Sequence, residues 1–300
     1  MVSRPATPHG ADAGLSAESD GGHRIVSAAG VAVPRMLYGT AWKKERTAGL
    51  VEMALRAGFR GIDTACQPKH YNEPGVGEGL CAVLGSALAR AQVYLQTKFT
   101  PLRGQDPEDV PYDPAAPLAE QVRQSFAASC ANLHTDYLDG LILHSPYPED
   151  ADTLEVWRAM ERLHDQGAVR QLGISNCYEP ARLEMLCANA RIKPAVVQNR
   201  FYAKTGFDTQ IRAFCRSRGM VYQSFWTLTA NPEVLANPVL TALAQGLGRT
   251  PAQVFFRYLT QQDMACLTGT SSREHMAQDL AIFDFRLTAA QCAAVAALVA

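Results

Sequence analysis

The stretch Gly58–Leu80, GFRGIDTACQPKHYNEPGVGEGL, decides how the rest of the chain is interpreted. It opens with a short apolar run, Phe59–Ile62, which predicts a β-strand that ends at Asp63. A turn of small residues follows, and Tyr71 lies just before a segment that predicts a helix. A carboxylate at a strand end and a phenol on the next loop can meet in one pocket.

Three later strands also end in functional groups. The segments YLQTK, LDGLILHS and RQLGISN carry Lys98, His144 and Ser175–Asn176 at their ends. Functional groups at several strand ends require a fold that gathers those ends at one face. A parallel β/α barrel does so, because its active site forms at the carboxyl ends of the strands.

Apolar runs alternate with helical patterns along the whole chain. The expected strands are 36–39, 58–63, 93–98, 137–144, 168–176, 194–199, 220–225 and 264–270. The expected helices are 46–57, 72–88, 117–132, 152–166, 179–190, 207–218, 251–261, 272–281 and 288–299, with a polar stretch over 231–238. We therefore predict an α/β fold, a single closed (β/α)8 TIM barrel over 24–300 with a short hairpin in Arg24–Leu37. An open doubly wound sheet is the alternative, but no G-x-G-x-x-G follows the early strands.

The composition is that of an ordinary globular protein. The 300 residues are 47% hydrophobic and 19% charged, a size that suits one barrel. A net charge of −1 gives no electrostatic reason to expect nucleic acid or an anionic membrane as a partner. No apolar run approaches the length of about 18 residues that predicts a membrane-spanning helix.

Residues 1–23 lack the apolar core of a signal peptide and are rich in Gly, Ser, Ala and Asp, which predicts a disordered tail and a cytoplasmic protein. The eight cysteines have no CxxC spacing and are expected to be reduced thiols. No Cys/His pair has ligand spacing, so no metal site is expected.

The four polar groups suit acid–base chemistry at a carbonyl. A tyrosine such as Tyr71 donates a proton near neutral pH only if its pKa drops from about 10. A neighbouring ammonium, Lys98, lowers that pKa, and Asp63 can keep the lysine charged and oriented. His144 can hydrogen-bond the substrate oxygen. Together they suit protonation of a carbonyl oxygen as a hydride reaches its carbon.

From about Arg24 to its C-terminus the chain resembles the aldo-keto reductase family. GFRGIDTA, QTK and LILHSP are similar to the family's aspartate, lysine and histidine motifs and identify Asp63, Lys98 and His144. The resemblance implies an NAD(P)H-binding β/α barrel with a catalytic tetrad of Asp, Tyr, Lys and His. Most members have the tyrosine five residues past the aspartate, where this chain has Pro68. Tyr71, eight residues on and next to Asn-Glu, is assigned the acid role instead.

The resemblance also implies cofactor contacts. The residues assigned to them are Gly39, Thr40, Ser175, Asn176, Gln198, Phe225, Thr270, Ser271, Arg273, His275, Gln278 and Asp279. Ser175, Asn176 and Gln198 match residues that hydrogen-bond the nicotinamide carboxamide, and Phe225 matches the aromatic side chain that stacks on the ring. Family habit favours NADP(H). The usual Lys and Arg near the adenosine phosphate are replaced by Gly269 and His275, so NAD(H) is possible.

The expected substrate pocket contains Trp42, Tyr112 and Trp226, with the proline-rich loop 99–117 as its lid. The acidic residues of that loop argue against a strongly anionic substrate. Arg200 either faces the substrate or pairs with Asp208.

The sequence thus predicts an oxidoreductase that transfers a hydride from NAD(P)H to an aldehyde or ketone, with Tyr71 as general acid. Its partner is a small-molecule carbonyl compound, with no nucleic acid or membrane, and the chain is a monomer or a weak homo-oligomer. One alternative is a lyase or aldolase that uses Lys98 as a Schiff-base nucleophile. Another is a nicotinamide-binding regulatory protein without turnover.

Overall fold

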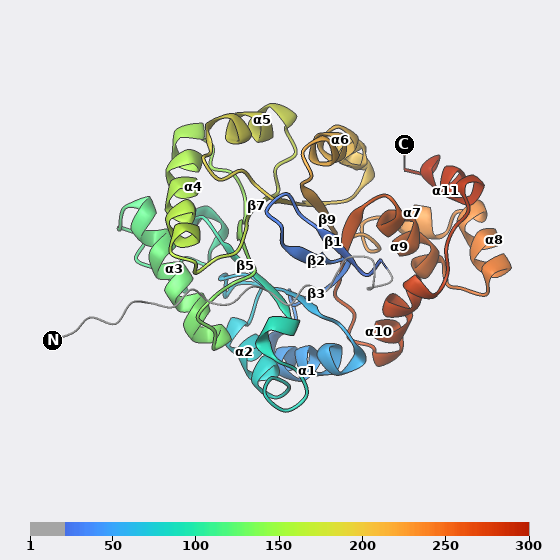
Figure 1. Cartoon of the computed structure of the whole chain (residues 1–300), viewed down its shortest axis with the longest axis horizontal. Coiled ribbons are helices and arrows are strands. Elements are labelled where there is room, and N and C mark those ends of the chain that lie inside the picture. Colours follow the sequence, from blue (N-terminus) through green and yellow to red (C-terminus); the bar gives the residue numbers. More distant parts are fainter. Residues whose placement is uncertain (1–21, 300) are drawn as a thin grey trace, which may run out of the picture.

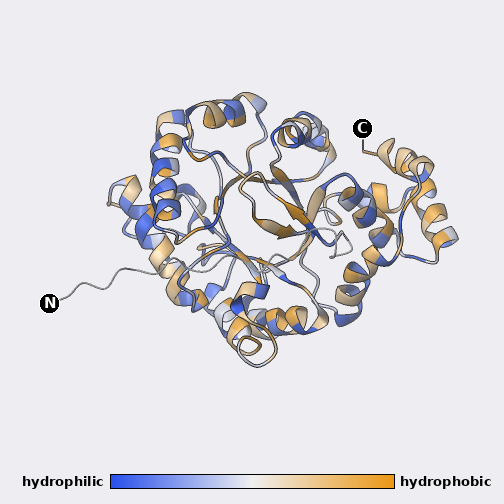
Figure 2. Cartoon of the chain, viewed as in Figure 1, coloured by the Kyte–Doolittle hydropathy of each residue, from blue (hydrophilic) through white to orange (hydrophobic). Residues whose placement is uncertain are grey.

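The computed structural model describes residues 22–299. Eight parallel strands close a barrel in the order β10-β3-β4-β5-β6-β7-β8-β9 (Figure 1). They are β3 (Met36–Gly39), β4 (Gly61–Asp63), β5 (Tyr94–Phe99), β6 (Gly140–Leu143), β7 (Leu172–Ser175), β8 (Val196–Arg200), β9 (Val221–Phe225) and β10 (Met264–Thr268). The predicted (β/α)8 barrel is confirmed. In Figure 2 the barrel strands carry mostly apolar residues, as expected for a parallel sheet with a buried outer face.

The predicted hairpin is also confirmed. β1 (Arg24–Val26) pairs antiparallel with β2 (Ala32–Pro34). Val33 is fully buried in an apolar cluster with residues that begin barrel strands, among them Tyr94, Val196 and Val221. The hairpin therefore closes the amino-terminal end of the barrel and leaves the carboxyl end for the site. Of the predicted tail, residues 1–21 lie outside the described part of the chain.

Helices surround the barrel (Figure 1). They are α1 (Thr47–Ala57), α2 (Glu73–Cys81), α3 (Leu118–Leu133), α4 (Asp150–Asp165), α5 (Pro180–Asn189), α6 (Thr209–Ser217), α7 (Pro232–Leu235), α8 (Pro238–Leu247), α9 (Pro251–Gln261), α10 (Arg273–Leu280) and α11 (Ala289–Ala296). Short 3-10 turns are η1 (Lys44–Arg46), η2 (Arg90–Gln92), η3 (Leu102–Gly104), η4 (Ala203–Asp208) and η5 (Ala281–Asp284).

Two helix predictions need correction. The helix expected over 72–88 ends at Cys81, and the chain then turns through Gly85, whose φ is 81°. Val83 is only 1% exposed, so the apolar pattern that suggested a longer helix reflects packing of a turn. The polar stretch 231–238 was assigned no helix, but it contains α7 and the first residue of α8. Three helices, α7, α8 and α9, thus lie between β9 and β10, whereas a (β/α)8 pattern predicts one helix between successive strands.

Across residues 22–299, no helix has both the length and the apolarity needed to cross a bilayer. In the same part of the chain, no three His, Cys, Asp or Glu side chains converge as metal ligands would. The eight cysteines are free thiols.

Close packing between α2 and the end of α3 depends on a glycine. A Cβ at Gly77 would lie 2.0 Å from the carbonyl oxygen of Asn132. Gly77→Ala is therefore expected to lower the free energy of unfolding by about 1–3 kcal/mol. Gly49→Ala in α1 is the control, because a Cβ there meets nothing within 4 Å. It is expected to raise the free energy by up to about 1 kcal/mol through helix propensity. Urea unfolding measures both, and similar effects of the two changes would contradict the packing argument.

Candidate active site

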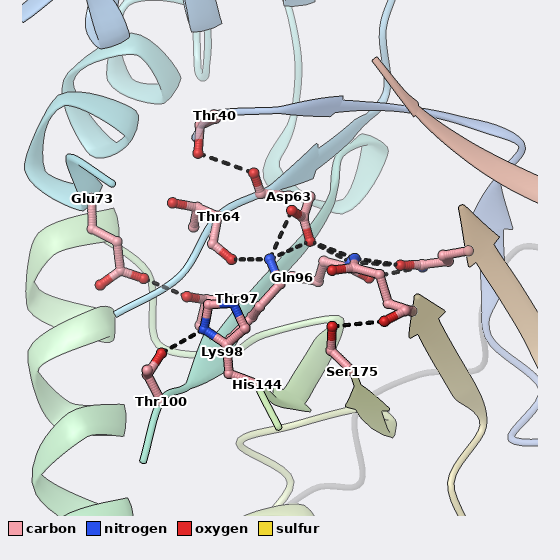
Figure 3. Close-up of polar contacts among 12 residues, drawn as sticks. Thr40, Asp63, Thr64, Glu73, Gln96, Thr97, Lys98, Thr100, His144 and Ser175 are labelled. Carbon is pink, nitrogen blue, oxygen red and sulfur yellow. Dashed lines mark hydrogen bonds and ion pairs between the residues drawn. The ribbon is translucent and has the colours of Figure 1, made fainter. Parts of the chain in front are cut away.

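A buried ion pair joins the ends of two neighbouring strands. Asp63 is the last residue of β4, and Lys98 lies near the end of β5. The Lys98 ammonium donates to the two carboxylate oxygens of Asp63 at 2.8 and 2.7 Å and to the carbonyl oxygen of Thr64 at 2.8 Å (Figure 3). Lys98 is 1% exposed and Asp63 2%. All three ammonium hydrogens have acceptors, so the charge is buried without an unsatisfied donor.

The ion pair keeps the lysine protonated. Burial opposes the charged ammonium, but the Asp63 carboxylate and the Tyr71 phenol favour it more strongly, so the pKa of Lys98 is raised above its ordinary value. The lysine is therefore a fixed positive charge.

Glutamine side chains in the barrel interior donate hydrogen bonds to the Asp63 carboxylate. The amide nitrogens of Gln96 and Gln198 donate to Asp63 Oδ1 at 2.6 and 2.9 Å. The Gln223 amide oxygen accepts from both of these amides at 2.8 and 2.9 Å. The Gln223 amide nitrogen also donates to Gln96 Oε1 at 3.0 Å. The same oxygen accepts from the Tyr94 hydroxyl group at 2.8 Å. The carboxylate is thus oriented by amide donors as well as by the ammonium.

Gln96 and Gln223 are residues of this network that the sequence did not assign to the site. The only signal was a glutamine within each of two otherwise apolar strands, YLQTKF and VYQSF. An isolated glutamine in a strand carries no information about which strand it will face, so its partner could not be predicted.

Tyr71 lies beside the ion pair. Its ring centroid is 5.2 Å from the Lys98 ammonium and 6.1 Å from the centroid of the His144 ring. The structure thus brings together the four residues that the sequence assigned to catalysis: Asp63, Tyr71, Lys98 and His144.

Glu73 fixes the start of α2, two residues after Tyr71. Its buried carboxylate accepts hydrogen bonds from Thr97 of β5 and, at 3.1 Å, from Ser129 of α3. Burial raises the pKa of Glu73, and these hydrogen bonds act in the opposite direction. Because Thr97 precedes Lys98, this contact ties the loop that carries Tyr71 to the strand that carries the lysine.

The acidity of Tyr71 differs from the sequence-based expectation. Burial raises its pKa, the Lys98 ammonium lowers it, and the Asp63 carboxylate raises it again, so the net pKa lies above 10. Lys98 acts in the expected direction, but burial outweighs it. Tyr71 is therefore a protonated phenol at neutral pH.

His144 follows β6 and is held as a neutral imidazole. Its Nδ1 lies 2.7 Å from the Thr100 hydroxyl oxygen (Figure 3). Burial, then the positive charges of Lys98 and His70, lower the pKa of His144 to about 3. When Thr100 donates to Nδ1, the ring proton is on Nε2, which makes this nitrogen a donor.

The residues expected at the nicotinamide carboxamide lie at neighbouring strand ends. The Ser175 hydroxyl group donates to the Gln198 carbonyl oxygen at 2.7 Å, and the Asn176 amide donates to the His144 carbonyl oxygen at 2.8 Å. Thr40 is buried and donates to the Asp63 carbonyl oxygen at 3.0 Å, and it follows Gly39 at the end of β3. The polar side chains of Thr40, Ser175 and Asn176 thus lie together at the carboxyl end of the barrel.

The three expected pocket residues differ in placement. Trp42 and Trp226 are 58% and 48% exposed. One face of each ring is covered, since the Trp42 ring centroid lies 3.9 Å from that of His70 and the Trp226 centroid lies 4.2 Å from the guanidinium carbon of Arg200. Tyr112 is 6% exposed, packs 5.6 Å from the Phe99 ring centroid and donates to the Thr100 carbonyl oxygen at 2.8 Å. The structure gives Tyr112 a packing role, and its place in the substrate pocket stays a prediction.

The turn between β10 and α10 contains the expected phosphate contacts. Ser271, Arg273 and His275 are exposed, whereas Asp279 is buried and accepts from the Thr268 hydroxyl group at 2.7 Å. Burial raises the pKa of Asp279 to about 6. Asp279 therefore anchors α10 to β10 and does not face the surface of the turn. Gln278 is half-buried, and its amide donates to Glu274 at 3.2 Å on the same helix.

Positive charge and amide groups at this turn suit a phosphate. The Lys43 ammonium donates to the Gly269 carbonyl oxygen, next to Thr270. A Cβ at Gly269 would lie 3.4 Å from that ammonium, an ordinary contact distance, so the Lys43 side chain lies directly against this turn. The start of α10 also favours an anion, although the backbone N–H groups of Ser272 and His275 already donate to the hydroxyl groups of Thr270 and Ser272.

Backbone strain is concentrated at the carboxyl end of the barrel. Trp42, Asn176 and Trp226 have φ values of 63°, 54° and 54°. Positive φ is rare for bulky side chains and persists where the surroundings enforce it. Each of these residues lies at or shortly after the carboxyl end of a barrel strand.

Comparisons with known proteins agree with this geometry. The sequence model of the Aldo/keto reductase family matches residues 35–300. An aldo-keto reductase of Mycolicibacterium smegmatis is 31% identical over 277 residues, which cover 92% of this chain and 93% of that protein. The glyoxal reductase of Bacillus subtilis is 30% identical over 238 residues, which cover 79% and 78%. The crystal structure of an aldo/keto reductase from Brucella melitensis has a TM-score of 0.78 at 27% identity and covers 92% of this chain and 98% of that one.

The neutral imidazole has a consequence for stability. An unfolded histidine takes up a proton near pH 6.5, whereas folded His144 stays neutral down to about pH 3. Between these values the unfolded state binds more protons, so the free energy of unfolding falls as the pH is lowered, by up to about 1.4 kcal/mol per pH unit for this group. We expect His144→Asn to remove this slope, measured by urea unfolding from pH 7 to pH 4. His275→Asn, on exposed α10, is the control and should keep it. Equal slopes in the wild type and His144→Asn would refute the neutral imidazole.

Proposed function

The chain belongs to the aldo/keto reductase family, and from this premise we propose that it reduces an aldehyde or ketone to an alcohol with NAD(P)H, with Tyr71 as the general acid. The family indicates an oxidoreductase that acts on carbonyl compounds. The observation that carries the finer proposal is the Lys98 ammonium, fixed by Asp63 and 5.2 Å from the Tyr71 ring centroid. One relative is named glyoxal reductase, and this name is consistent with the reduction of a carbonyl compound.

In this proposal the substrate oxygen lies between the Tyr71 hydroxyl group and Nε2 of His144. A neutral His144 donates a hydrogen bond to that oxygen without competing as a charged acid. Bound NAD(P)H supplies the hydride to the carbonyl carbon. Ser175, Asn176 and Gln198 are proposed to orient the nicotinamide, which is a positioning effect.

The raised pKa of Tyr71 is compatible with an acid role. The phenol keeps its proton until negative charge develops on the substrate oxygen, and an alkoxide is a stronger base than a phenolate. Proton transfer then leaves a phenolate next to the Lys98 ammonium, whose charge stabilises it. The pKa therefore need not fall near neutrality before the substrate is bound.

The geometry disfavours the Schiff-base alternative. A lysine nucleophile must be a free amine, which enzymes obtain by lowering its pKa. The Lys98 amine has its three donors engaged and its pKa is raised. The alternative of a regulatory protein without turnover makes a different experimental prediction from the reductase, namely nicotinamide binding with no reduction of any carbonyl compound.

We favour NADPH over NADH because three basic side chains surround the turn after β10. Lys43 reaches the Gly269 carbonyl oxygen, and Arg273 and His275 are exposed on the first turn of α10. These groups compensate for the Lys and Arg that the family often has there and this chain lacks. A 2′-phosphate would gain charge-assisted hydrogen bonds at this position.

Tyr71→Phe tests the proposed function. We expect it to keep NADPH affinity, measured by fluorescence titration, and to lower kcat by about 10²–10⁴-fold on an aldehyde panel, because the proton donor is removed. The same titration should show tighter binding of NADPH than of NADH. Tyr137→Phe is the matched control. Its ring stacks with Arg90 and Arg170, at 4.1 and 4.8 Å, away from the four residues of the site.

Near-normal turnover of Tyr71→Phe would remove this residue from the mechanism. Binding of NADPH without turnover by the wild type on the whole panel would favour the regulatory alternative.

A further inference from the structure

Arg200, the last residue of β8, lies among aromatic rings, and within residues 22–299 it has no ion-pair partner. Its guanidinium carbon is 4.2 Å from the Trp226 ring centroid, 5.4 Å from that of Tyr202 and 6.0 Å from that of Phe225. Its Nε is buried and has no hydrogen-bond partner within residues 22–299. Aromatic faces stabilise the cation and hold it in place, but they do not satisfy its N–H groups.

The alternative partner suggested by the sequence is occupied elsewhere. The Asp208 carboxylate accepts from the Asn199 amide at 2.7 Å and from the Tyr222 hydroxyl group at 2.9 Å. Burial raises the pKa of Asp208, and these hydrogen bonds act in the opposite direction. No ion pair joins Asp208 to Arg200, so the arginine has no carboxylate within hydrogen-bonding distance in the described chain.

Strand alternation directs Arg200 towards the mouth of the barrel. Gln198 points into the barrel and donates to Asp63 at 2.9 Å, while Asn199 points outward. Successive side chains of a strand alternate between faces, so Arg200 shares the inward face with Gln198. It lies about 7 Å further along the strand, towards the carboxyl end. Phe225, its partner in the ladder with β9, occupies the same layer.

The charges of the site leave Arg200 as a free cation at this side of the mouth. Lys98 is neutralised by Asp63, and His144 is uncharged, so neither offers a net positive charge to a ligand.

We propose that Arg200 is an anion-binding residue at the mouth of the barrel, where its guanidinium takes a carboxylate or phosphate group of a bound ligand. A planar guanidinium held against aromatic rings presents its N–H groups as a fixed fork, the geometry that matches these anions. The anion belongs either to the carbonyl substrate or to the pyrophosphate of the cofactor. The location of the ligand rests on the proposed function. The acidic residues of loop 99–117 argued against an anionic substrate, but that loop follows β5, whereas Arg200 is on β8.

Arg200→Met tests this proposal, since methionine keeps an apolar side chain against the rings and removes the charge. Arg218→Met is the matched control. The Arg218 guanidinium also stacks on a ring, 4.3 Å from the Phe214 centroid, but it lies at the C-terminal end of α6, away from the mouth. The measurements are the KM values for 4-carboxybenzaldehyde and its neutral methyl ester, and the Kd for NADPH.

A substrate anion at Arg200 predicts that Arg200→Met raises the KM for the carboxylate at least tenfold and leaves that for the ester within twofold. A cofactor anion predicts at least a tenfold rise in the Kd for NADPH, with the ratio of the two KM values unchanged. Values within twofold of those of Arg218→Met in every measurement would overturn the proposal. If Arg200→Met does not fold, Arg200→Lys replaces it. Lysine keeps the positive charge but lacks the planar fork, so it should raise the same KM or Kd by a smaller factor. An unchanged KM and Kd in Arg200→Lys would overturn the proposal.

Wild-type turnover of the methyl ester tests the reductase proposal separately. If the wild type reduces neither aldehyde, titration of pyrophosphate and of benzoate into wild type and Arg200→Met tests anion binding by itself. Weaker binding of either anion by the variant supports the role of Arg200, and equal binding of both removes it.

Discussion

The buried ion pair between Asp63 and Lys98 is the interaction on which the site depends. An unpaired ammonium inside a barrel would lose its proton, and an unpaired carboxylate would gain one, because burial penalises each charge. Together they remain ionised with nearly all polar atoms satisfied. The amides of Gln96 and Gln198 add donors to the same carboxylate, so its orientation is fixed from inside the barrel. A fixed ammonium beside a phenol follows from this arrangement.

The barrel makes such an arrangement possible because its ladder sets the relative heights of the strand ends. Asp63 pairs with Gln96 in the register of β4 and β5, which brings Lys98, two residues on, to the level of the mouth. Further polar side chains extend from this carboxylate towards the amino-terminal end of the barrel. Tyr94 accepts from Gln171 at 2.9 Å, and Gln171 accepts from Ser27 of the hairpin turn at 2.6 Å. Hydrogen bonds thus connect the closed end of the barrel to the carboxylate at its open end.

Much of this was accessible from the sequence, for identifiable reasons. Alternating strands and helices predicted the barrel, and polar residues at strand ends predicted that Asp63, Lys98 and His144 would meet. The interior residues Gln96 and Gln223 were missed because hydrophobic periodicity describes an inward face as apolar and cannot say which strands face each other across it. The direction of the Tyr71 pKa was missed because burial, a property of the folded chain, exceeds the effect of the neighbouring ammonium. That Asp208 pairs with Asn199 and Tyr222 instead of Arg200 could not be predicted, because it depends on the packing of α6 against β8 and β9.

A double-mutant cycle on the ion pair measures the central interaction directly. The free energy of unfolding is compared for wild type, Asp63→Asn, Lys98→Met and the double variant by urea denaturation. Each single change leaves a buried group without its partner and should cost about 3–5 kcal/mol, whereas the double change should cost much less than the sum. A coupling of at least about 2 kcal/mol agrees with the account. Additivity within about 0.5 kcal/mol, the behaviour of independent sites, would contradict it.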